Sequence, residues 1–143
     1  MGELNSAPVS GVIVYVLRQM GAAKQVLFLH RSGGQFGRSW WPVAGTPKEN
    51  ETPLKTAQRE LKEETGLVVD GWEPFGINIP NADGVQILKA FVVTVTTQPI
   101  QLNYEHDDYK WLTPRQALGQ VPPHSRRFIQ HLIDNFMGGK SEV

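Results

Sequence analysis

The sequence predicts an α/β (α+β) fold in which helices cover a mixed β-sheet. Two observations support this prediction: runs rich in β-branched residues recur between turn signals, and two segments repeat apolar residues at helical spacing. With 143 residues, of which 40% are hydrophobic, the chain can bury a core but is too short for two ordinary domains. We therefore expect one domain over residues 1–143, with residues 1–7 loosely ordered.

The first two strands are predicted over residues 10–17 and 25–30, with a hairpin connection over 18–24. The glycine-rich segment 32–37 lacks the Gly-Lys-Ser/Thr ending of a phosphate-binding loop, and no helical pattern follows it directly. We therefore interpret it as an ordinary loop. A short extended piece over 40–43 and a polar loop up to Glu51 complete this part.

A helix is predicted to begin at Thr52, a hydroxyl N-cap followed by Pro53 at the first helical position. Gly66 should end it, because glycine tolerates the left-handed conformation that follows a helix. The expected apolar stripe of this helix consists of Leu54, Ala57 and Leu61.

The remaining elements follow the same signals. Residues 81–84 form a turn signal between two runs of strand-forming residues. The predicted elements are strands over 72–80, 86–97 and 109–112, a short helix from Thr113, and a final helix over 125–137 that ends at Gly138 and Gly139.

Composition excludes several classes of site and partner. Fourteen basic residues balance fourteen acidic ones, which argues against nucleic acid as a partner. The chain has no cysteine, so any metal must bind oxygen or imidazole. No apolar run is long enough to span a membrane, and no secretory leader is recognisable, so a cytoplasmic location is expected.

Three glutamates of the predicted helix, Glu60, Glu63 and Glu64, fall on one face at spacings of three and four residues. Like charges so placed destabilise a helix by about a few tenths of a kcal/mol per pair. Either the face is solvated and relieved by its lysines and Arg59, or it binds a hard cation such as Mg²⁺.

The surrounding pattern favours the cation. Nine constrained positions span 23 residues: Gly45, Glu51, Arg59-Glu60-Leu61, Glu63-Glu64 and Gly66-Leu67. This pattern resembles the signature of the Nudix hydrolases at every fixed position.

The resemblance implies an α/β/α sandwich and a hydrolase that needs Mg²⁺, with Mn²⁺ as a possible substitute. The implied metal ligands are Glu60 and Glu64 first, with Glu63 as a further ligand. In the family, the arginine at the position of Arg59 pairs with the glutamate at that of Glu51 and orients the helix. The alternative for Arg59 is a surface ion pair with Glu63.

The loop before the helix departs from the family pattern. Pro42-Val43-Ala44-Gly45 stands where Pro-Gly-Gly is common. The resemblance implies a metal ligand in the backbone carbonyl of Ala44, which would be strained if that position had a positive φ. Gly45 is expected to allow close backbone approach at the site.

A later loop often supplies the general base or another metal ligand in this family. Here Glu105 is the implied candidate, with Glu60 or Glu63 otherwise, and His106 beside it is either a base or a hydrogen-bonded surface residue. This stretch, like Trp40-Trp41-Pro42, resembles the pyrophosphatases that act on dihydroneopterin triphosphate and deoxyadenosine triphosphate.

Substrate contacts are predicted outside the signature. Arg31 and Arg38 are candidate phosphate ligands, or solvated loop residues. Trp41 or Trp40 is a candidate to stack on a base or pterin ring, or a packing residue.

The expected function is hydrolysis of a nucleoside or pterin triphosphate to monophosphate and pyrophosphate. The alternatives are dinucleoside polyphosphates, nucleotide sugars or oxidised nucleotides as substrates, and a regulatory module that binds nucleotides without turnover. The resemblance makes a homodimer plausible, but no residue pattern points to one.

Overall fold

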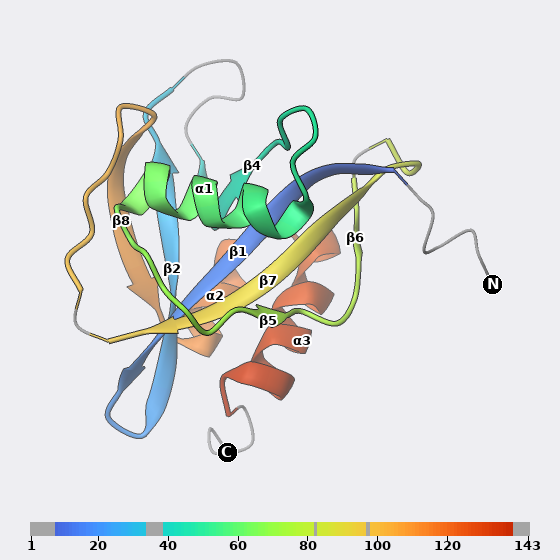
Figure 1. Ribbon diagram of the computed structural model, residues 1–143. Helices are drawn as coiled ribbons and strands as arrows, with labels where there is room; N and C mark the ends of the chain where they lie inside the picture. Colours follow the sequence, from blue (N-terminus) through green and yellow to red (C-terminus); the bar gives the residue numbers. More distant parts are fainter. Residues whose placement is uncertain (1–7, 34–38, 82, 97, 139–143) are drawn as a thin grey trace.

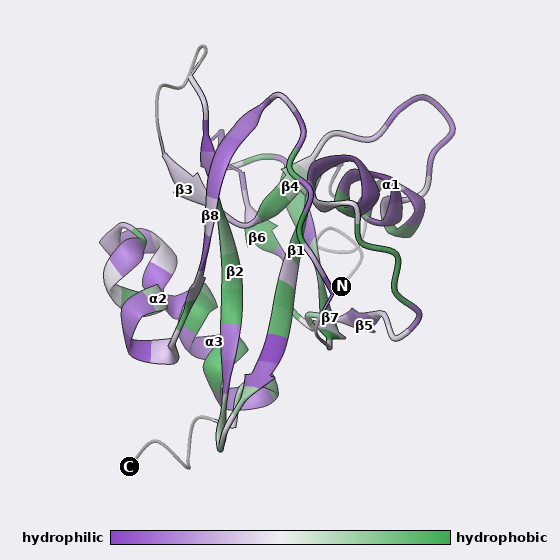
Figure 2. Ribbon diagram, turned by 90° about the vertical axis from the view of Figure 1, so that its left-hand side faces the viewer, coloured by the Kyte–Doolittle hydropathy of each residue, from purple (hydrophilic) through white to green (hydrophobic). Residues whose placement is uncertain are grey.

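The computed structural model describes residues 8–33, 39–81, 83–96 and 98–138. Within these residues an eight-stranded sheet lies between helix α1 (Pro53–Thr65) on one face and helices α2 (Pro114–Gln120) and α3 (Arg126–Phe136) on the other, as Figures 1 and 2 show from two sides. This arrangement confirms the predicted α/β sandwich. Residues 1–7 and 139–143, including Gly139, and most of the 32–37 loop lie outside the described residues.

The strands follow the order β3-β2-β1-β7-β5, with β4 beside β1, β6 beside β7 and β8 beside β2. β1 and β7 run parallel, whereas every other pair in the described sheet is antiparallel, so the sheet is mixed. Their bounds are β1 Val9–Met20, β2 Ala23–Arg31, β3 Trp40–Trp41, β4 Val43–Gly45, β5 Glu73–Pro74, β6 Ile79–Pro80, β7 Ile87–Val95 and β8 His106–Leu112.

β1 separates two apolar cores. Its side chains alternate, so that Ile13 and Tyr15 pack with α2 and α3, while Val12 and Val14 pack with α1. A strand covered on both faces needs apolar residues at every position, which explains the unbroken apolar run in the sequence. Burial between the layers also raises the pKa of the Tyr15 hydroxyl far above its ordinary value.

The ends of α1 form as the local sequence predicts. The Thr52 hydroxyl accepts a hydrogen bond from Lys55 N at 3.2 Å, and Pro53 is the first helical residue. At the other end Gly66 has a φ of 78° and donates to Lys62 O at 2.8 Å. Both predicted ends are confirmed.

The predicted apolar stripe of α1 is partly wrong. Ala57 and Leu61 are fully buried, but Leu54 is 39% exposed, and Thr56 is buried in addition. The Thr56 hydroxyl can be buried because it donates to Glu51 Oε1 at 2.8 Å and to Thr52 O at 3.0 Å.

The strand predicted over 72–80 is also wrong as one element. Only the short strands β5 and β6 form there, each ending in a proline that cannot donate to a sheet. Gly76 between them has a φ of 98°, which bends the chain out of extended conformation. The hairpin connection is shorter than expected, a turn at Gly21 and Ala22, and β8 begins earlier, at His106.

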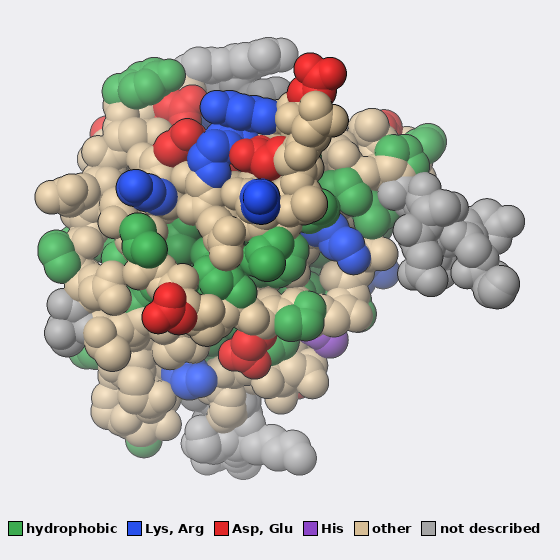
Figure 3. All heavy atoms as spheres, viewed as in Figure 1, with side chains coloured by type: hydrophobic (Ala, Val, Ile, Leu, Met, Phe, Trp, Pro, Cys, Tyr) green, Lys and Arg blue, Asp and Glu red, His purple; other side chains and the backbone are tan. Residues whose placement is uncertain are grey.

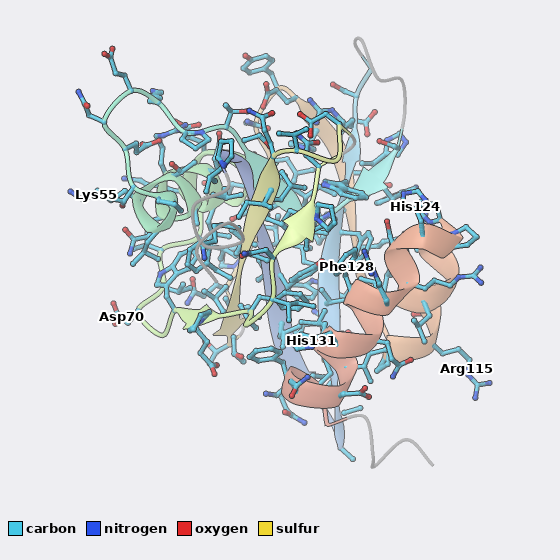
Figure 4. The ribbon with its side chains drawn as sticks, turned by 90° about the vertical axis from the view of Figure 1, so that its right-hand side faces the viewer. Lys55, Asp70, Arg115, His124, Phe128 and His131 are labelled. Carbon is cyan, nitrogen blue, oxygen red and sulfur yellow. The ribbon has the colours of Figure 1, made fainter. Side chains whose placement is uncertain are left out.

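The helices present some side chains to solvent and others to the sheet. Figure 4 shows Lys55 and Arg115 pointing away from the molecule, while Phe128 and His131 project from α3 toward the sheet. The predicted short helix begins at Pro114 with Thr113 as its N-cap, and the final helix is preceded by a single 3₁₀ turn over Pro123–Ser125. No helix in the described part of the chain is long and apolar enough to cross a membrane.

The packing of α1 leads to a stability prediction. Replacing the fully buried Leu61 by alanine should lower the free energy of unfolding by about 2–5 kcal/mol, because it leaves a cavity between α1 and the sheet. Leu54→Ala on the same helix is the control and should change it by less than about 1 kcal/mol. Urea denaturation of the two variants checks this, and equal effects would contradict the packing of α1.

Candidate active site

A pocket of about 580 Å³ lies where α1 packs against β4 and the start of β1. Its walls come from several elements in chain order. They are the start of β1, the end of β2, the β3–β4 segment, the loop before α1, α1 itself, the turn after β6, the start of β7, and the start of β8 with the residue before it. Its lining side chains that bear on chemistry are Ser10, Arg31, Trp41, Lys48, Arg59, Glu60, Glu64, Asn81, Glu105 and His106.

β4 approaches α1 very closely at Gly45. A Cβ atom added at this position would overlap the carboxyl group of Glu60. Gly45 therefore allows the backbone of β4 and the helix carboxylates to occupy the same wall of the pocket. Ala44 beside it pairs with Ile13 of β1 and is not among the described residues with positive φ, so alanine is unstrained there.

Glu60 and Glu64 form a carboxyl pair on that wall. Glu64 is only 3% exposed. Burial, then hydrogen bonding with Glu60 and the charge of Glu60, raise the pKa of Glu64 well above its ordinary value, against a lowering by the Ala44 backbone. Burial also raises the pKa of Glu60. The two carboxyl groups therefore favour a shared proton near neutral pH.

Arg59 is held by a two-pronged ion pair. Its Nε lies 2.8 Å from Glu51 Oε2, and its Nη2 lies 2.9 Å from Glu51 Oε1. Glu51 also accepts from Lys48 N at 2.9 Å, and hydrogen bonds from Arg59 and then Lys48 hold the pKa of this carboxyl far below its usual range. The pair ties the loop before α1 to the helix through the fork geometry that arginine offers a carboxylate.

Arg59 also contacts the other acidic residues of α1. Its Nη1 lies 3.3 Å from both Glu60 Oε2 and Glu63 Oε1, and its Nη2 donates to Thr46 O at 3.1 Å. Both sequence interpretations of Arg59 therefore describe contacts that are present.

The three glutamates of α1 do not form one cluster. The Glu63 side chain is 49% exposed and turns toward Arg59, whereas Glu60 and Glu64 face the pocket. In Figure 3 acidic and basic side chains alternate along the solvent face of α1. Among the described residues no three acidic or histidine side chains surround a common point. Glu63 therefore lies apart from the Glu60–Glu64 pair that lines the pocket.

The first residue of β8, His106, and the residue before it, Glu105, bring two further groups to the pocket. Glu105 is exposed at its rim, and its charge is one of the causes that raise the pKa of Glu64. His106 is more enclosed: its Nδ1 lies 3.0 Å from Asn103 Oδ1, and its Nε2 lies 3.8 Å from Glu64 Oε1. Burial, and then the charge of Arg31, lower the pKa of His106, which favours the neutral ring.

Only some of the candidate substrate-binding residues line the pocket. Arg31 and Trp41 line the pocket, and so does Lys48, whereas Arg38 lies outside the described residues. Trp40 does not line the pocket. Its ring lies 4.8 Å from that of His30 and 4.0 Å from Lys110 Nζ, so it is a packing residue.

Sequence reasoning missed Ser10, Lys48 and Asn81. Ser10 and Asn81 reach the pocket together, with Asn81 Nδ2 donating to Ser10 Oγ at 2.7 Å. The only signal for Asn81 was the turn over 81–84, and nothing in the sequence around Ser10 indicates a site. Lys48 lies between two signature positions, Gly45 and Glu51, where the signature fixes no residue type.

Known structures share this fold. The chain is similar to an Ap4A hydrolase of C. elegans in a binary complex, with a TM-score of 0.73 and 18% identity over 87% of this chain and 94% of that one. The NUDIX domain of NrtR from Shewanella oneidensis complexed with ADP ribose gives a TM-score of 0.73 and 20% identity, covering 90% and 88%. The dihydroneopterin triphosphate pyrophosphohydrolase of E. coli gives 0.71 and 23%, covering 90% and 99%.

A curated relative from Myxococcus xanthus, named octanoyltransferase, is 29% identical over 121 residues, which are 80% of this chain and 34% of that protein. The chain thus spans about a third of the length of this relative. The family model of the NUDIX domain matches residues 7–132. Since this match includes the sheet, α1 and the whole pocket, the chain belongs to the Nudix family.

Proposed function

We propose that this chain is a Mg²⁺-dependent hydrolase that cleaves the pyrophosphate linkage of a nucleoside or pterin triphosphate to give a monophosphate and pyrophosphate. The observation on which this rests most is the Glu60–Glu64 carboxyl pair, placed in the same pocket as Arg31 and Lys48. A pocket with carboxylates on one wall and cations on another suits a cation-bound polyphosphate.

The donor set fits a hard divalent cation. Two carboxyl groups that must otherwise share a proton become fully ionised when a cation replaces it. Glu60 and Glu64 would hold the ion, with the Ala44 carbonyl and Glu63 as further oxygen donors, and Glu105 would be another donor only if a different group served as the base. When bound, Mg²⁺ supplies charge neutralisation of the phosphates and an acidic water; Mn²⁺ offers the same ligand preference.

The cationic side chains would bind phosphate oxygens. Arg31 at the end of β2 and Lys48 in the loop before α1 both line the pocket. Arg59 is already bound to Glu51 by both prongs of its guanidinium, so its role is to hold α1 against the loop. Trp41 offers an aromatic wall for the ring of the substrate.

Glu105 is the general base in this proposal. Glu105 lines the pocket, and its carboxylate is exposed to solvent. It can therefore accept a proton from an attacking water and release that proton to solvent. His106 Nε2, facing Glu64, is the second choice. Glu60 and Glu63 are less suited, because both are assigned to the cation and both contact Arg59 at 3.3 Å.

The choice of triphosphate rests on likeness. The sequence around Trp40 and Glu105 resembles the dihydroneopterin and deoxyadenosine triphosphate enzymes, and the E. coli dihydroneopterin triphosphate pyrophosphohydrolase is among the similar folds. The sequence contains Glu60 and Glu64 as well as Glu63 and Glu105. The presence of all these carboxylates favours turnover over a binding role.

The proposed function is tested by product analysis. The purified chain with Mg²⁺ should convert one member of a panel of nucleoside triphosphates, dihydroneopterin triphosphate, dinucleoside polyphosphates and nucleotide sugars to monophosphate and pyrophosphate, as resolved by ion-pair chromatography. Glu64→Gln should reduce that rate by about a thousandfold with the fold intact, since it removes a cation ligand. No turnover on any member with either Mg²⁺ or Mn²⁺, or full activity in Glu64→Gln, would contradict the proposal.

Cation binding should be linked to proton release. Because the pKa of Glu64 is raised, the pair holds a proton at neutral pH that Mg²⁺ must displace, so affinity should increase as the pH rises from about 6 to about 9, with release of about one proton. Calorimetric titrations of Mg²⁺ in buffers with different ionisation enthalpies measure this. Glu64→Gln should bind Mg²⁺ more weakly and release no proton, and an affinity independent of pH would refute the linkage.

The assignment of the base is tested separately. Glu105→Gln should lower kcat by about a hundredfold or more and leave the melting temperature unchanged, because the side chain is exposed. Glu73→Gln, an exposed glutamate on β5 that does not line the pocket, is the matched control and should retain full activity. An unchanged kcat in Glu105→Gln would transfer the role to another group.

A further inference from the structure

The amide of Asn103 lies between two side chains of the pocket, those of Glu105 and His106. Its Nδ2 donates to Glu105 Oε1 at 3.4 Å, and its Oδ1 lies 3.0 Å from Nδ1 of His106. Asn103 is half-buried and does not itself line the pocket, whereas Glu105 and His106 both do. One side chain outside the pocket therefore contacts two side chains that face into it.

The chemistry of these groups determines which way the amide faces. A carboxylate only accepts hydrogen bonds, so Glu105 takes the Nδ2 side of the amide and the Oδ1 side faces His106. An amide oxygen also only accepts, so Nδ1 of His106 carries the hydrogen of that contact. A neutral imidazole has one N–H group, and Nε2 of His106 is therefore left with a lone pair.

This tautomer turns an acceptor toward the carboxyl pair on α1. The Nε2 atom of His106 lies 3.8 Å from Glu64 Oε1, and the His106 side chain is only 7% exposed. At that separation the two groups do not form a direct hydrogen bond. A water that attacks beside the carboxyl pair would thus meet two acceptors, Nε2 of His106 and the Glu105 carboxylate, which are oriented by the same amide.

The backbone around this amide is held by other contacts. Ser32, after the end of β2, donates from its N–H to Glu105 O at 2.9 Å and from its hydroxyl to Tyr104 O at 3.1 Å. On the other side, Gln101 N donates to Thr65 O at the end of α1 at 2.8 Å. Because these bonds fix the chain path, removal of the amide should change the direction of the two side chains and leave the turn in place.

We propose that Asn103 is a positioning residue, which orients Glu105 and His106 toward the pocket through the two ends of its amide. This inference rests on the proposed function, in which Glu105 is the base, and it adds a residue that is assigned contact with neither substrate nor cation. The rate depends steeply on the geometry of a base, since a misplacement of about 1 Å can cost about a hundredfold. Asn103 therefore acts on the rate of hydrolysis and leaves the binding of substrate unchanged.

The first test observes the histidine ring and requires no turnover. Nitrogen-15 NMR of the imidazole groups at about pH 8, where histidine is neutral, should show His106 with its hydrogen on Nδ1 and a lone pair on Nε2. The signals lost in His106→Gln assign this ring. Asn103→Ala should shift it toward the tautomer with the hydrogen on Nε2, whereas Asn103→Asp, which keeps an acceptor oxygen, should not. A hydrogen on Nε2 in the unmodified chain, or a ring unaffected by Asn103→Ala, would overturn the inference.

The second test measures kcat and KM separately. Asn103→Ala should lower kcat about tenfold, with KM changed by less than about twofold and the melting temperature unchanged. Asn103→Asp should lower kcat at least as much, because it places a like charge beside Glu105. The matched control is Asn135→Ala on α3, whose amide lies 3.3 Å from Nδ1 of His131 outside the pocket, and it should retain full activity. A higher KM with kcat retained in Asn103→Ala would contradict a positioning role.

A double variant shows whether Asn103 acts through Glu105. In the Glu105→Gln background, Asn103→Ala should lower kcat by less than about threefold, because the group that it positions has already been replaced. The same tenfold loss in both backgrounds would refute the inference. If the unmodified chain hydrolyses no substrate, the proposed function fails, and the NMR measurement decides on its own whether Asn103 orients the ring of His106.

Discussion

The burial of two carboxyl groups against a strand is the constraint on which the rest of the site depends. Glu64 is almost fully enclosed, and burial is the largest cause of the raised pKa of both Glu60 and Glu64. Enclosed carboxylates are costly unless a proton or a cation compensates them. The surrounding features serve to hold this arrangement: a glycine where β4 meets Glu60, and an arginine fork that fixes α1 to the preceding loop.

The packing of the sheet supports the buried carboxyl pair. β1 is apolar on both faces, with α1 on one side and α2 and α3 on the other, so the strand that forms the pocket floor is anchored by two cores. Helix α1 combines two surfaces, since Ala57 and Leu61 pack on the sheet while Glu60 and Glu64 face the pocket one turn apart. When α1 packs on the sheet, it therefore also places the carboxyl pair in the pocket.

The features that the sequence predicted correctly depend on short spacings. The ends of α1 follow from Thr52, Pro53 and Gly66 alone, because capping involves neighbouring backbone groups. Leu54 was misassigned because helical spacing marks a face but does not say how wide the contact with the sheet is. The segment over 72–80 was misread because β-rich composition outweighed its two prolines and Gly76.

The limits of prediction at the site have the same origin. Glu51 and Arg59 are eight residues apart and belong to one motif, so their pairing could be anticipated. The contact of Glu63 with Arg59 was one of two alternatives, and helical spacing alone could not decide between it and the pocket. Ser10 and Asn81 are 71 residues apart and meet only because β1 pairs in parallel with β7, an adjacency that no local pattern encodes.

The two contacts join residues at very different distances along the sequence, and they belong to different ends of the pocket. These two ends should therefore differ in the free energy of local opening. The Glu51–Arg59 contact closes a loop of a few residues within a capped helix and its preceding turn, whereas the Ser10–Asn81 contact holds a turn to the first residues of the sheet's central strand. Elements at strand ends and turns open locally at lower free energy than a helix packed on a core. Local opening of the native protein should therefore loosen the end of the pocket formed by Ser10 and Asn81 while the carboxyl pair stays assembled, so that exchange with solvent at the turn leaves the pair undisturbed.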